Sequence, residues 1–442
     1  MSADITARLD AAVPQSLADL AELVAIPSIS SQPEHEPDVR RSAQWVVDHL
    51  LELGATDARI VQEGGAPAVI AHFPAPAGKP TVCLYSHHDV QPIGDPAGWT
   101  TPAFVATERG GRLYGRGSSD DKGGVAAHLL ALRAWDGKPP IGVTLFIEGE
   151  EEVGSPTVAT IIERHREELA ADAFLILDSN NWEPGQPAFT STLRGVVDCV
   201  VRVATLEHGV HSGEFGGVVP DALMALSRLL ATLHDDRGNV AVAGLTSSVA
   251  SDLDHPLDRL ATETGKLPGV AWIGDGSVVQ RLWNSPSISI LAIDTTRIAD
   301  ASNTLIPAAS AKVSLRVPPG QDAAAALEAL KQHLLTHAPW GAEVTVTDGS
   351  VGQPGIMKLE GPVYEAMASA VHDAWGVDAV QMGMGGSIPL VSDFQRNFPG
   401  ALVLCTAVGD PNSRAHGLDE SVDLDDWRKA ALAEALLFER LA

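Results

Sequence analysis

The stretch that most constrains this chain is residues 113–124, LYGRGSSDDKGG. It places two adjacent carboxylates, Asp120 and Asp121, after a glycine-rich turn and before an apolar run with helical spacing. A carboxylate held in a tight loop at the start of a helix suits a hard or borderline metal cation, which needs anionic oxygen at a fixed angle. The alternative is an ordinary helix N-cap, a position that Asp also favours. Taken alone, the stretch leaves both interpretations open.

Length, charge and cysteine content limit what the chain can be. With 442 residues it is too long for one ordinary hydrophobic core, so we expect two domains. The formal net charge of −27 argues against a nucleic-acid partner, because no basic surface remains to neutralise phosphates. The three cysteines are widely spaced and form no CxxC pair, so neither a disulfide framework nor a thiolate zinc site is expected.

The N-terminal segment and the hydropathy pattern bear on location. The opening sequence MSADITARLD lacks the basic and apolar regions of a signal peptide. No apolar run reaches the length of about 18 residues that a membrane-spanning helix requires. These features predict a cytoplasmic protein with no membrane partner.

Apolar runs that alternate with helical patterns define the first part of the chain. Continuous apolar strands separated by helices indicate an α/β layer whose largely parallel sheet is buried on both faces. The same pattern returns near the C-terminus, with a helix at 362–375 and a strand at 401–407. The expected strands of the first part are 68–72, 81–86, 143–148 and 173–178, and its expected helices include 123–135 and 158–169.

The pattern changes at Gly195, where shorter elements follow the order β-α-β-β-α-β. This is the split arrangement of a small ferredoxin-like α+β sandwich. The polar, glycine-rich stretch 234–284 is an insertion within it. We therefore predict one α/β domain, formed by residues 1–192 and 354–442 and interrupted by an α+β domain of residues 193–353.

Several strands of the α/β domain run directly into acidic or histidine residues. Ligands in open α/β sheets gather at the carboxyl ends of the strands, so these side chains can converge although they are far apart in sequence. Two imidazoles and three carboxylates are a suitable set for a pair of divalent metals with one bridging carboxylate. Any single member could instead be a surface acid in a loop. The expected cluster is His87, Asp120, Glu152, Asp178 and, from a late loop, His416.

Two further carboxylates fit supporting roles at such a site. Asp89 follows His87 by two residues, so it can accept the imidazole N–H and fix the metal-binding tautomer. Glu151 and Glu152 are neighbours that should point in different directions, so one can bind metal while the other takes a proton from water as general base. A run of three acids could also be a solvated loop, but this one directly follows a buried strand.

The chain resembles the dinuclear zinc exopeptidases and aminoacylases. The resemblance is carried by YSHHDVQP, LYGRGSSDDKGG, EGEEEVGS, a strand-ending LDS and a late AHG, which occur in the family's order over nearly the whole chain. The DVQP, SDDKGG and HSGEFGG wordings bring it closest to the carnosinase-like dipeptidase branch. The resemblance implies a catalytic di-metal α/β domain interrupted by an inserted lid and dimerisation domain.

The family's metal ligands can be carried over to matching positions. The resemblance implies that Asp120 bridges two divalent metals, that His87 and Asp178 complete one site, and that Glu152 and His416 complete the other. The metals implied are zinc ions, with manganese or cobalt as alternatives.

The same resemblance assigns roles in catalysis. It makes Glu151 the general base and Asp89 the residue that orients a histidine ligand. It also implies a cis peptide bond between Asp120 and Asp121.

The inserted domain and a late turn match the family's substrate-binding positions. The resemblance implies a homodimer in which His211 reaches into the partner's cleft to stabilise the oxyanion. It implies that Arg316 holds the substrate's terminal carboxylate, for which a planar guanidinium is suited. It also places backbone close to the substrate at Gly385, Gly386 and Ser387.

The predicted function is a metal-dependent hydrolase that cleaves dipeptides or similar small peptides with a free C-terminal carboxylate. One departure leaves an alternative open, although the DVQP and HSGEFGG motifs favour the dipeptidase: Met384 stands where the dipeptidase branch usually has an acid. If that acid selects a free substrate amine, the chain could instead be an N-acyl-amino-acid deacylase of the acetylornithine or succinyl-diaminopimelate type. A third alternative is a non-catalytic metal- or peptide-binding relative.

Overall fold

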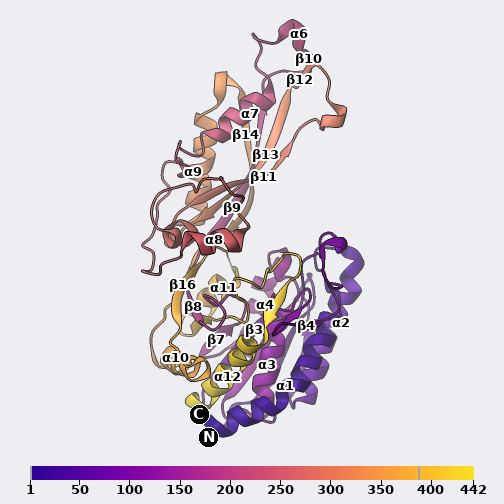
Figure 1. Ribbon diagram of the computed structural model, residues 1–442, viewed down its shortest axis with the longest axis vertical. Helices are drawn as coiled ribbons and strands as arrows, with labels where there is room; N and C mark the ends of the chain where they lie inside the picture. The colour runs from indigo at the N-terminus through magenta and orange to yellow at the C-terminus, as the bar shows by residue number, and fades with distance from the viewer. Residues whose placement is uncertain (1, 387–388) are drawn as a thin grey trace. The chain divides into compact units, whose positions relative to one another are not determined.

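The computed structural model describes residues 2–386 and 389–442, and its helices and strands are labelled in Figure 1. The described residues form two compact units. The first contains residues 2–191, 357–382 and 389–442, and the second contains residues 192–356 and 383–386. Among the described residues, no helix combines the length and the hydropathy needed to cross a membrane.

A six-stranded sheet forms the centre of the first unit. β3 pairs with β6 on one side and with β7 on the other, β17 continues the sheet beyond β7, and all of these pairs are parallel. Only β2 and β1, at the other edge, add antiparallel pairs. The prediction of a mostly parallel sheet is therefore confirmed. In spatial order the strands are β1 Asp57–Val61, β2 Ala68–Phe73, β6 Gly142–Glu148, β3 Thr81–His87, β7 Ala173–Ile176 and β17 Leu402–Cys405.

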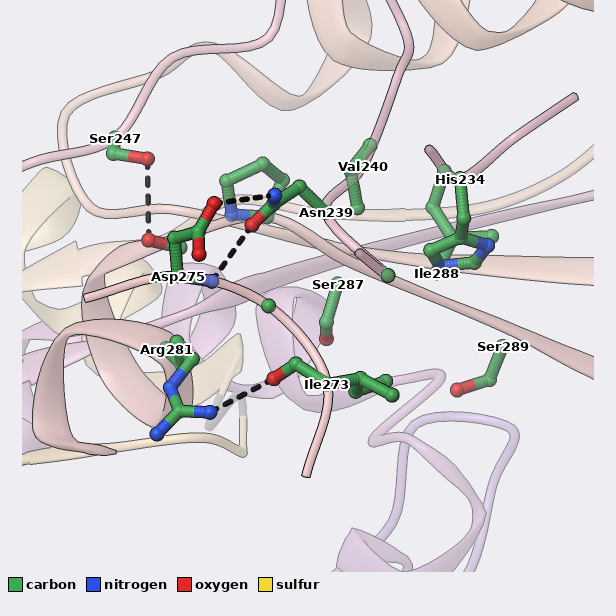
Figure 2. Close-up of a pocket in the computed structure, with 14 residues that line it drawn as sticks. His234, Asn239, Val240, Ser247, Ile273, Asp275, Arg281, Ser287, Ile288 and Ser289 are labelled. Atoms are coloured by element: carbon green, nitrogen blue, oxygen red, sulfur yellow. Dashed lines mark hydrogen bonds between the residues drawn. The ribbon is translucent and has the colours of Figure 1, made fainter. Parts of the chain in front are cut away.

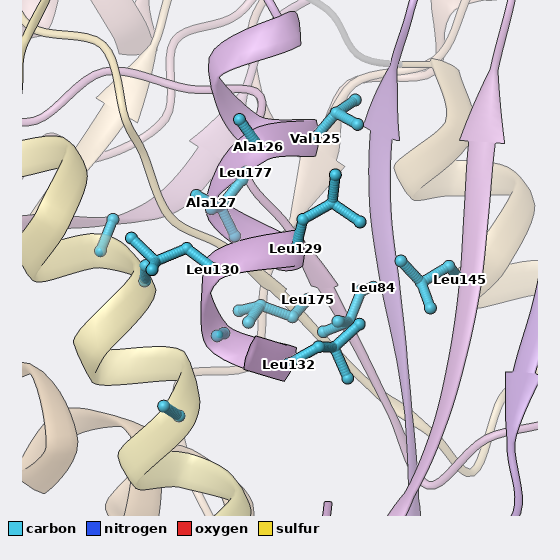
Figure 3. Close-up of a cluster of buried hydrophobic side chains, with 14 of the residues drawn as sticks. Leu84, Val125, Ala126, Ala127, Leu129, Leu130, Leu132, Leu145, Leu175 and Leu177 are labelled. Atoms are coloured by element: carbon cyan, nitrogen blue, oxygen red, sulfur yellow. The ribbon is translucent and has the colours of Figure 1, made fainter. Parts of the chain in front are cut away.

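Helix α3, Lys122–Ala134, is buried along almost its whole length and forms the core of this unit. Figure 3 shows Leu129 and Leu132 directed toward the sheet, while Leu130 lies on the side of α12, Leu424–Leu441. Burying each leucine contributes about 1.5–3 kcal/mol to the stability of the fold. These contacts hold α3 between the sheet and α12. The other helices of the unit are α1 Ser2–Val24, α2 Glu36–Glu52, α4 Val158–Arg164, α5 Arg166–Leu169, α10 Pro362–Trp375 and α11 Pro389–Asn397.

Short elements position the loops of the first unit. In a three-stranded sheet, β5 pairs with both β4 and β18, which brings the chain near residue 115 beside the chain near residue 420. The strands are β4 Thr107–Arg109, β5 Arg112–Tyr114 and β18 Ser421–Asp423, and the short 3-10 helices are η1 Pro33–His35, η2 Pro96–Gly98 and η3 Glu151–Val153.

The second unit is a four-stranded antiparallel sheet with two helices on one face. Alternate residues of β9 are buried under these helices, as the period of two predicts for a half-covered sheet. The predicted α+β sandwich is therefore confirmed. The strands, in spatial order, are β11 Ser287–Asp294, β13 Ala308–Val317, β9 Gly195–Ala204 and β14 Glu343–Gly352, and the helices are α7 Ala222–Ala231 and α9 Ala323–Thr336.

The remaining elements are short. A two-stranded ribbon and two short helices extend the second unit: β10 Val210–His211, β12 Thr304–Leu305, α6 Ser212–Phe215 and α8 Leu257–Thr264. Three-residue 3-10 helices and a π-helix complete it: η4 Gln280–Asn284, η5 Ile298–Asp300 and η6 Pro339–Gly341. A further small sheet has the order β15 Gly355–Ile356, β8 Ala188–Leu193 and β16 Val380–Met384.

The insertion 234–284 and the start of β11 enclose a polar hollow of about 330 Å³ (Figure 2). Much of its lining is bonded to itself. Asn239 Nδ2 donates to Asp275 Oδ2 at 2.9 Å, and Arg281 Nη1 donates to Ile273 O at 2.8 Å. These bonds hold the insertion together, which explains the polar composition of this stretch.

Two short segments and one residue group differently from the predicted division. Residues 354–356 and 383–386 and Thr192 were expected with the α/β domain but belong to the second unit. Contacts with Arg194 account for the segment 383–386. The backbone N–H of Arg194 donates to Met384 O at 3.2 Å, and its Nε donates to Gly385 O at 3.2 Å.

Candidate active site

The expected cluster forms in the first unit, where parallel strands end together. His87 is the last residue of β3 and pairs in register with Glu148, the last residue of β6. Asp178 follows the end of β7, which also pairs with β3. Because parallel strands present their carboxyl ends at one edge, these side chains are brought to the same place by the sheet itself.

Asp120 lies between the two histidines. Its Oδ1 is 3.1 Å from His87 Nε2, and its Oδ2 is 3.1 Å from His416 Nε2. His416 Nε2 is also 3.1 Å from Glu152 Oε2, and His87 Nε2 is 4.0 Å from Asp178 Oδ1. The structure thus brings all five predicted residues together.

These separations suit shared metal ligands. Ligand atoms about 2.0–2.2 Å from one tetrahedral ion lie roughly 3.3–3.6 Å apart. Two triads place one potential ligand atom of each residue within 4.8 Å of the others, namely His87, Glu151 and Asp178, and His87, Asp120 and Glu152. The histidines and carboxylates are therefore arranged for a metal site.

The pKa values of the carboxylates in the cluster also indicate a metal site. Burial and the negative charges of Asp120 and Glu152 raise the pKa of Asp178 to about 7, although the charge of His87 acts in the opposite direction. Burial and the charge of Asp178 raise the pKa of Glu151 well above its usual value. Gathering so many carboxylates in a buried place is costly unless cations neutralise them. The donor set therefore fits divalent metal.

The histidines carry the positive charge of the cluster in the metal-free protein. Hydrogen bonds to Asp120 and Glu152 raise the pKa of His416 to about 10. Burial alone would lower the pKa of His87, but hydrogen bonds to Asp120 and Asp89 raise it well above its usual value. A metal ion would replace these protons, since a ligating imidazole must present a free nitrogen.

Asp89 lies behind the cluster and contacts two of its segments. Its Oδ1 is 3.3 Å from His87 Nδ1, the ring nitrogen opposite the one that faces Asp120. Its two carboxylate oxygens also accept the backbone N–H groups of Glu151 and Glu152, at 3.3 and 3.2 Å. One buried carboxylate thus contacts the β3 end and the start of η3.

The loop that carries Asp120 is shaped by close packing. The expected cis peptide bond between Asp120 and Asp121 is present. Asp121 is fully buried and its Oδ2 accepts the backbone N–H of His87 at 3.3 Å, so only the first acid of the doublet faces the histidines. A side chain at Gly123 would place its Cβ 2.2 Å from Ser118 O, which explains the glycine at this position.

Three residues at this site were missed by the sequence analysis. Gln91 Nε2 donates to Glu152 Oε2 at 2.9 Å, so it helps to hold that carboxylate. Arg116 and Glu420 are both buried and form an ion pair beneath the loops of Asp120 and His416. The only sequence signal for Glu420 is that it is an acid four residues after His416. Such a spacing is common by chance in so acidic a chain.

The third acid of the run, Glu150, has a structural role. Its Oε1 accepts the backbone N–H and the hydroxyl of Thr157, both at 2.6 Å, and its Oε2 accepts the backbone N–H of Ala66 at 2.8 Å. It therefore fixes the loop from which Glu151 and Glu152 project.

The predicted substrate-binding residues belong to the second unit, whereas the histidine–carboxylate cluster belongs wholly to the first. His211 is exposed at the end of β10, and its Nδ1 accepts the backbone N–H of Gly213 at 3.1 Å. Arg316 is half-buried on β13 opposite Ser287, and burial lowers its pKa.

The late glycine turn is described in part. A Cβ added at Gly385 would lie 2.8 Å from Arg194 Nη2, so a larger residue at this position would have to displace the Arg194 guanidinium. Gly386 is partly buried beside it. Ser387 lies outside the described residues.

A mostly parallel α/β sheet and the loops beside its carboxyl edge thus bring two histidines and several carboxylates together in an arrangement that suits divalent metal. Residues 83–440 match the family described as Peptidase family M20/M25/M40, and the chain belongs to this family. The predicted family resemblance is thereby confirmed.

Named relatives support the dipeptidase branch. The chain is 36% identical over 425 residues to the cysteinylglycine-S-conjugate dipeptidase of Corynebacterium striatum, covering 94% of this chain and 93% of the relative. It is 27% identical over 451 residues to the Cys-Gly metallodipeptidase of Candida albicans, covering 94% and 92%. The crystal structure of human carnosine dipeptidase 1 matches with a TM-score of 0.85 and 25% identity over 100% of this chain and 98% of that one.

Proposed function

We propose that this protein is a metal-dependent dipeptidase that hydrolyses the amide bond of dipeptides with a free C-terminal carboxylate. The observation that carries the proposal is Asp120, whose two oxygens face two different histidines at 3.1 Å while Glu151 lies within the same cluster. The names of the relatives, which include Cys-Gly and cysteinylglycine-S-conjugate dipeptidases, support the substrate class.

The proposed cofactor is a pair of divalent metals, with zinc favoured by the nitrogen and oxygen donors and manganese or cobalt as alternatives. His87 and Asp178 would hold one ion, Glu152 and His416 the other, and Asp120 both. When bound, such ions polarise the scissile carbonyl and acidify the attacking water.

The residues of the chain would divide the remaining work. Glu151 would accept the proton of the attacking water and deliver it to the leaving amine nitrogen. Its position beside Asp178 supports this role, because neighbouring negative charge favours proton uptake. Asp89 would hold the His87 ring with Nε2 directed at metal.

The second unit would bind the substrate and form a homodimer. Arg316 would hold the substrate carboxylate, with backbone at Gly385, Gly386 and Ser387 close to the substrate. His211 of the partner subunit would stabilise the oxyanion. The proposed lid and dimerisation domain, residues 193–353, lies within the second unit, and the proposed catalytic domain, residues 1–192 and 354–442, contains the whole of the first unit.

One edge of the second unit supports the dimer. β11 is an edge strand, and Ile290, Leu291 and Ile293 on it are 38%, 59% and 46% exposed. An exposed apolar edge strand is a template for pairing with another chain. Light scattering should give a dimer for the wild type and a monomer for Leu291→Lys, with Val249→Lys, an exposed apolar position outside the strand, as the control that stays dimeric.

Mixing two inactive variants tests the contribution of His211 across the dimer. His211→Ala and Glu151→Gln should each be inactive alone. Random mixing would recover about a quarter of wild-type activity, because about half of the dimers are heterodimers and each of these has both residues intact in one of its two sites. No recovery in proven heterodimers would place His211 in its own subunit's site or remove it from the mechanism.

The first test of the function compares matched substrates on metal-reconstituted enzyme. Free-amine dipeptides and N-acetyl amino acids with the same C-terminal residue are offered at equal concentration, with Glu151→Gln as the blank. Faster cleavage of the dipeptides supports the proposal. Preference for the acylated set would make the enzyme an N-acyl-amino-acid deacylase, the alternative that Met384 leaves open. Cleavage of neither, with two metals bound, would favour a non-catalytic relative.

A further inference from the structure

Glu420 is a fully buried carboxylate whose hydrogen bonds all go to the loop that carries Asp120. Its Oε1 accepts the backbone N–H and the hydroxyl of Ser119, at 3.0 and 3.1 Å, and the backbone N–H of Asp120 at 3.1 Å. Its Oε2 accepts the backbone N–H of Gly117 at 3.0 Å and Arg116 Nη1 at 2.5 Å. One side chain thus organises the turn 116–120.

Arg116, which is 1% exposed, extends this contact to two other segments. Its Nη2 donates to Gly417 O at 3.1 Å and to Pro92 O at 3.2 Å. The Arg116–Glu420 pair therefore joins the segment after β3, the loop of Asp120 and the loop of His416. A guanidinium fork is suited to this, because it offers several donors in a fixed geometry.

The loop of His416 is held by side chains from other segments, including Arg112 at Asp410 and Thr100 at Asp419, and the Arg116–Glu420 pair lies at its C-terminal end. His416 itself has a positive φ of 62°, and Arg414 and Asp419 have φ values of 54° and 55°. The segment lies between β17 and β18, outside regular secondary structure. Its imidazole is 59% exposed, so burial of the ring does little to hold it.

Asp120 has a second anchor that does not involve Glu420. The next residue, Asp121, binds the backbone of His87 through its carboxylate, and α3 begins immediately afterwards. The His87 side is fixed by strand pairing. Loss of the buried pair should therefore displace His416 relative to Asp120 more than it disturbs His87 and Asp178.

We propose that Arg116 and Glu420 are positioning residues that set the spacing between Asp120 and His416, and so control metal binding on the His416 side selectively. The inference rests on the proposed two-metal site. Residues that orient metal ligands typically change metal affinity by 10–100-fold when replaced. The ligands of the two metal positions would then be held differently. Strand pairing would fix those on the His87 side, and a buried ion pair would fix His416.

The test measures zinc stoichiometry and affinity in full-length Glu420→Gln by competition with a chelating dye, and repeats the titration with cobalt(II), whose absorption reports on the ligand geometry. We expect one of the two ions to bind at least tenfold more weakly and the other to be unchanged within about twofold. The matched control is Asp19→Asn, which removes the carboxylate of another buried pair, Arg133–Asp19 at 2.5 Å, joining α1 to α3. This control should bind both ions as the wild type does.

Retention of both affinities in Glu420→Gln, or equal weakening of both ions in a folded variant, would overturn the inference while leaving the proposed function intact. A wild type that binds fewer than two ions would overturn the proposed metal site itself, and the inference with it. If Glu420→Gln does not fold, Arg116→Lys provides a second test. This variant keeps the buried positive charge but loses the guanidinium hydrogen bonds to Gly417 O and Pro92 O. The same selective weakening is expected for that variant, and equal affinities would overturn the inference.

Discussion

The two histidines of the active site are held by different means. His87 is fully buried at the end of β3, where its backbone pairs with Glu148 of β6 and its N–H donates to Asp121 Oδ2. His416 is more than half exposed on a loop with several positive φ angles. Both nevertheless place Nε2 3.1 Å from Asp120. The comparison teaches that a loop can place a side chain as closely as a strand does when buried side chains of other segments, here Arg116 with Glu420, bind it.

The largest expected effect concerns Glu151, which lies on the His87 side but should act on substrate rather than on either ligand set. Glu151→Gln should lower kcat by about 10³-fold, the range of general acid–base catalysis, with both metals still bound. Steady-state kinetics combined with metal analysis would check this.

Glu150, the neighbour of Glu151, is expected to behave differently. It is hydrogen-bonded to Thr157 and Ala66 rather than directed at the histidines. Glu150→Gln should lower stability while leaving most of the activity. An active Glu151→Gln would remove the base from the proposed mechanism.

The two histidines should differ in their effect on stability. Because His87 is fully buried, His87→Ala should lower the free energy of unfolding of the metal-free protein by about 2–3 kcal/mol. His416→Ala should lower it by less, about 1 kcal/mol, because its ion pairs with Asp120 and Glu152 are partly exposed and therefore partly screened by solvent. Denaturant unfolding of both variants measures the difference, and equal losses would show that the loop is as integral to the fold as the strand.

The pH dependence of the metal-free protein should sharpen the comparison. Asp178 has its pKa raised from 3.8 to about 7 and His416 from 6.5 to about 10, so each of these groups binds more protons in the folded state between its two values, whereas burial lowers the pKa of His88 to about 4 and of Lys122 to about 7 and offsets part of this difference. Stability therefore falls as pH rises, first through the Asp178 range and then through the His416 range. Between pH 5 and pH 9 the Tm should fall by at least about 5 °C.

The metal-loaded enzyme is the control for that experiment, because bound cations replace the protons of both groups. Its Tm should depend less on pH across the same range. A metal-free Tm that rises from pH 5 to pH 9 would mean that the cluster does not hold its protons as the geometry indicates.

The smallest expected effect is kinetic. For the proposed pair of zinc ions, we expect a chelator to remove them in two phases, the first from the exposed His416 side and the second from the buried His87 side. Stopped-flow release of zinc to a dye would resolve them. The Gln91→Ala variant, which loses a 2.9 Å hydrogen bond to Glu152, should accelerate only the first phase, by a few-fold.

Much of this protein was determined by its sequence alone. The α/β order, the antiparallel α+β insertion and the five clustered residues could be predicted, because continuous apolar strands and strand-end ligands are local patterns. The cis bond at Asp120–Asp121 and the family followed from motif wording.

Only the tertiary structure decided how those residues are held. The contact between Arg116 and Glu420 joins positions 304 residues apart, and no local period encodes such a pair. Within the acidic run, the fold decided that Glu150 binds backbone while Glu152 faces His416. Periodicity records which face of an element is buried, whereas the partner of a buried charge depends on which distant loop the folded chain brings to it.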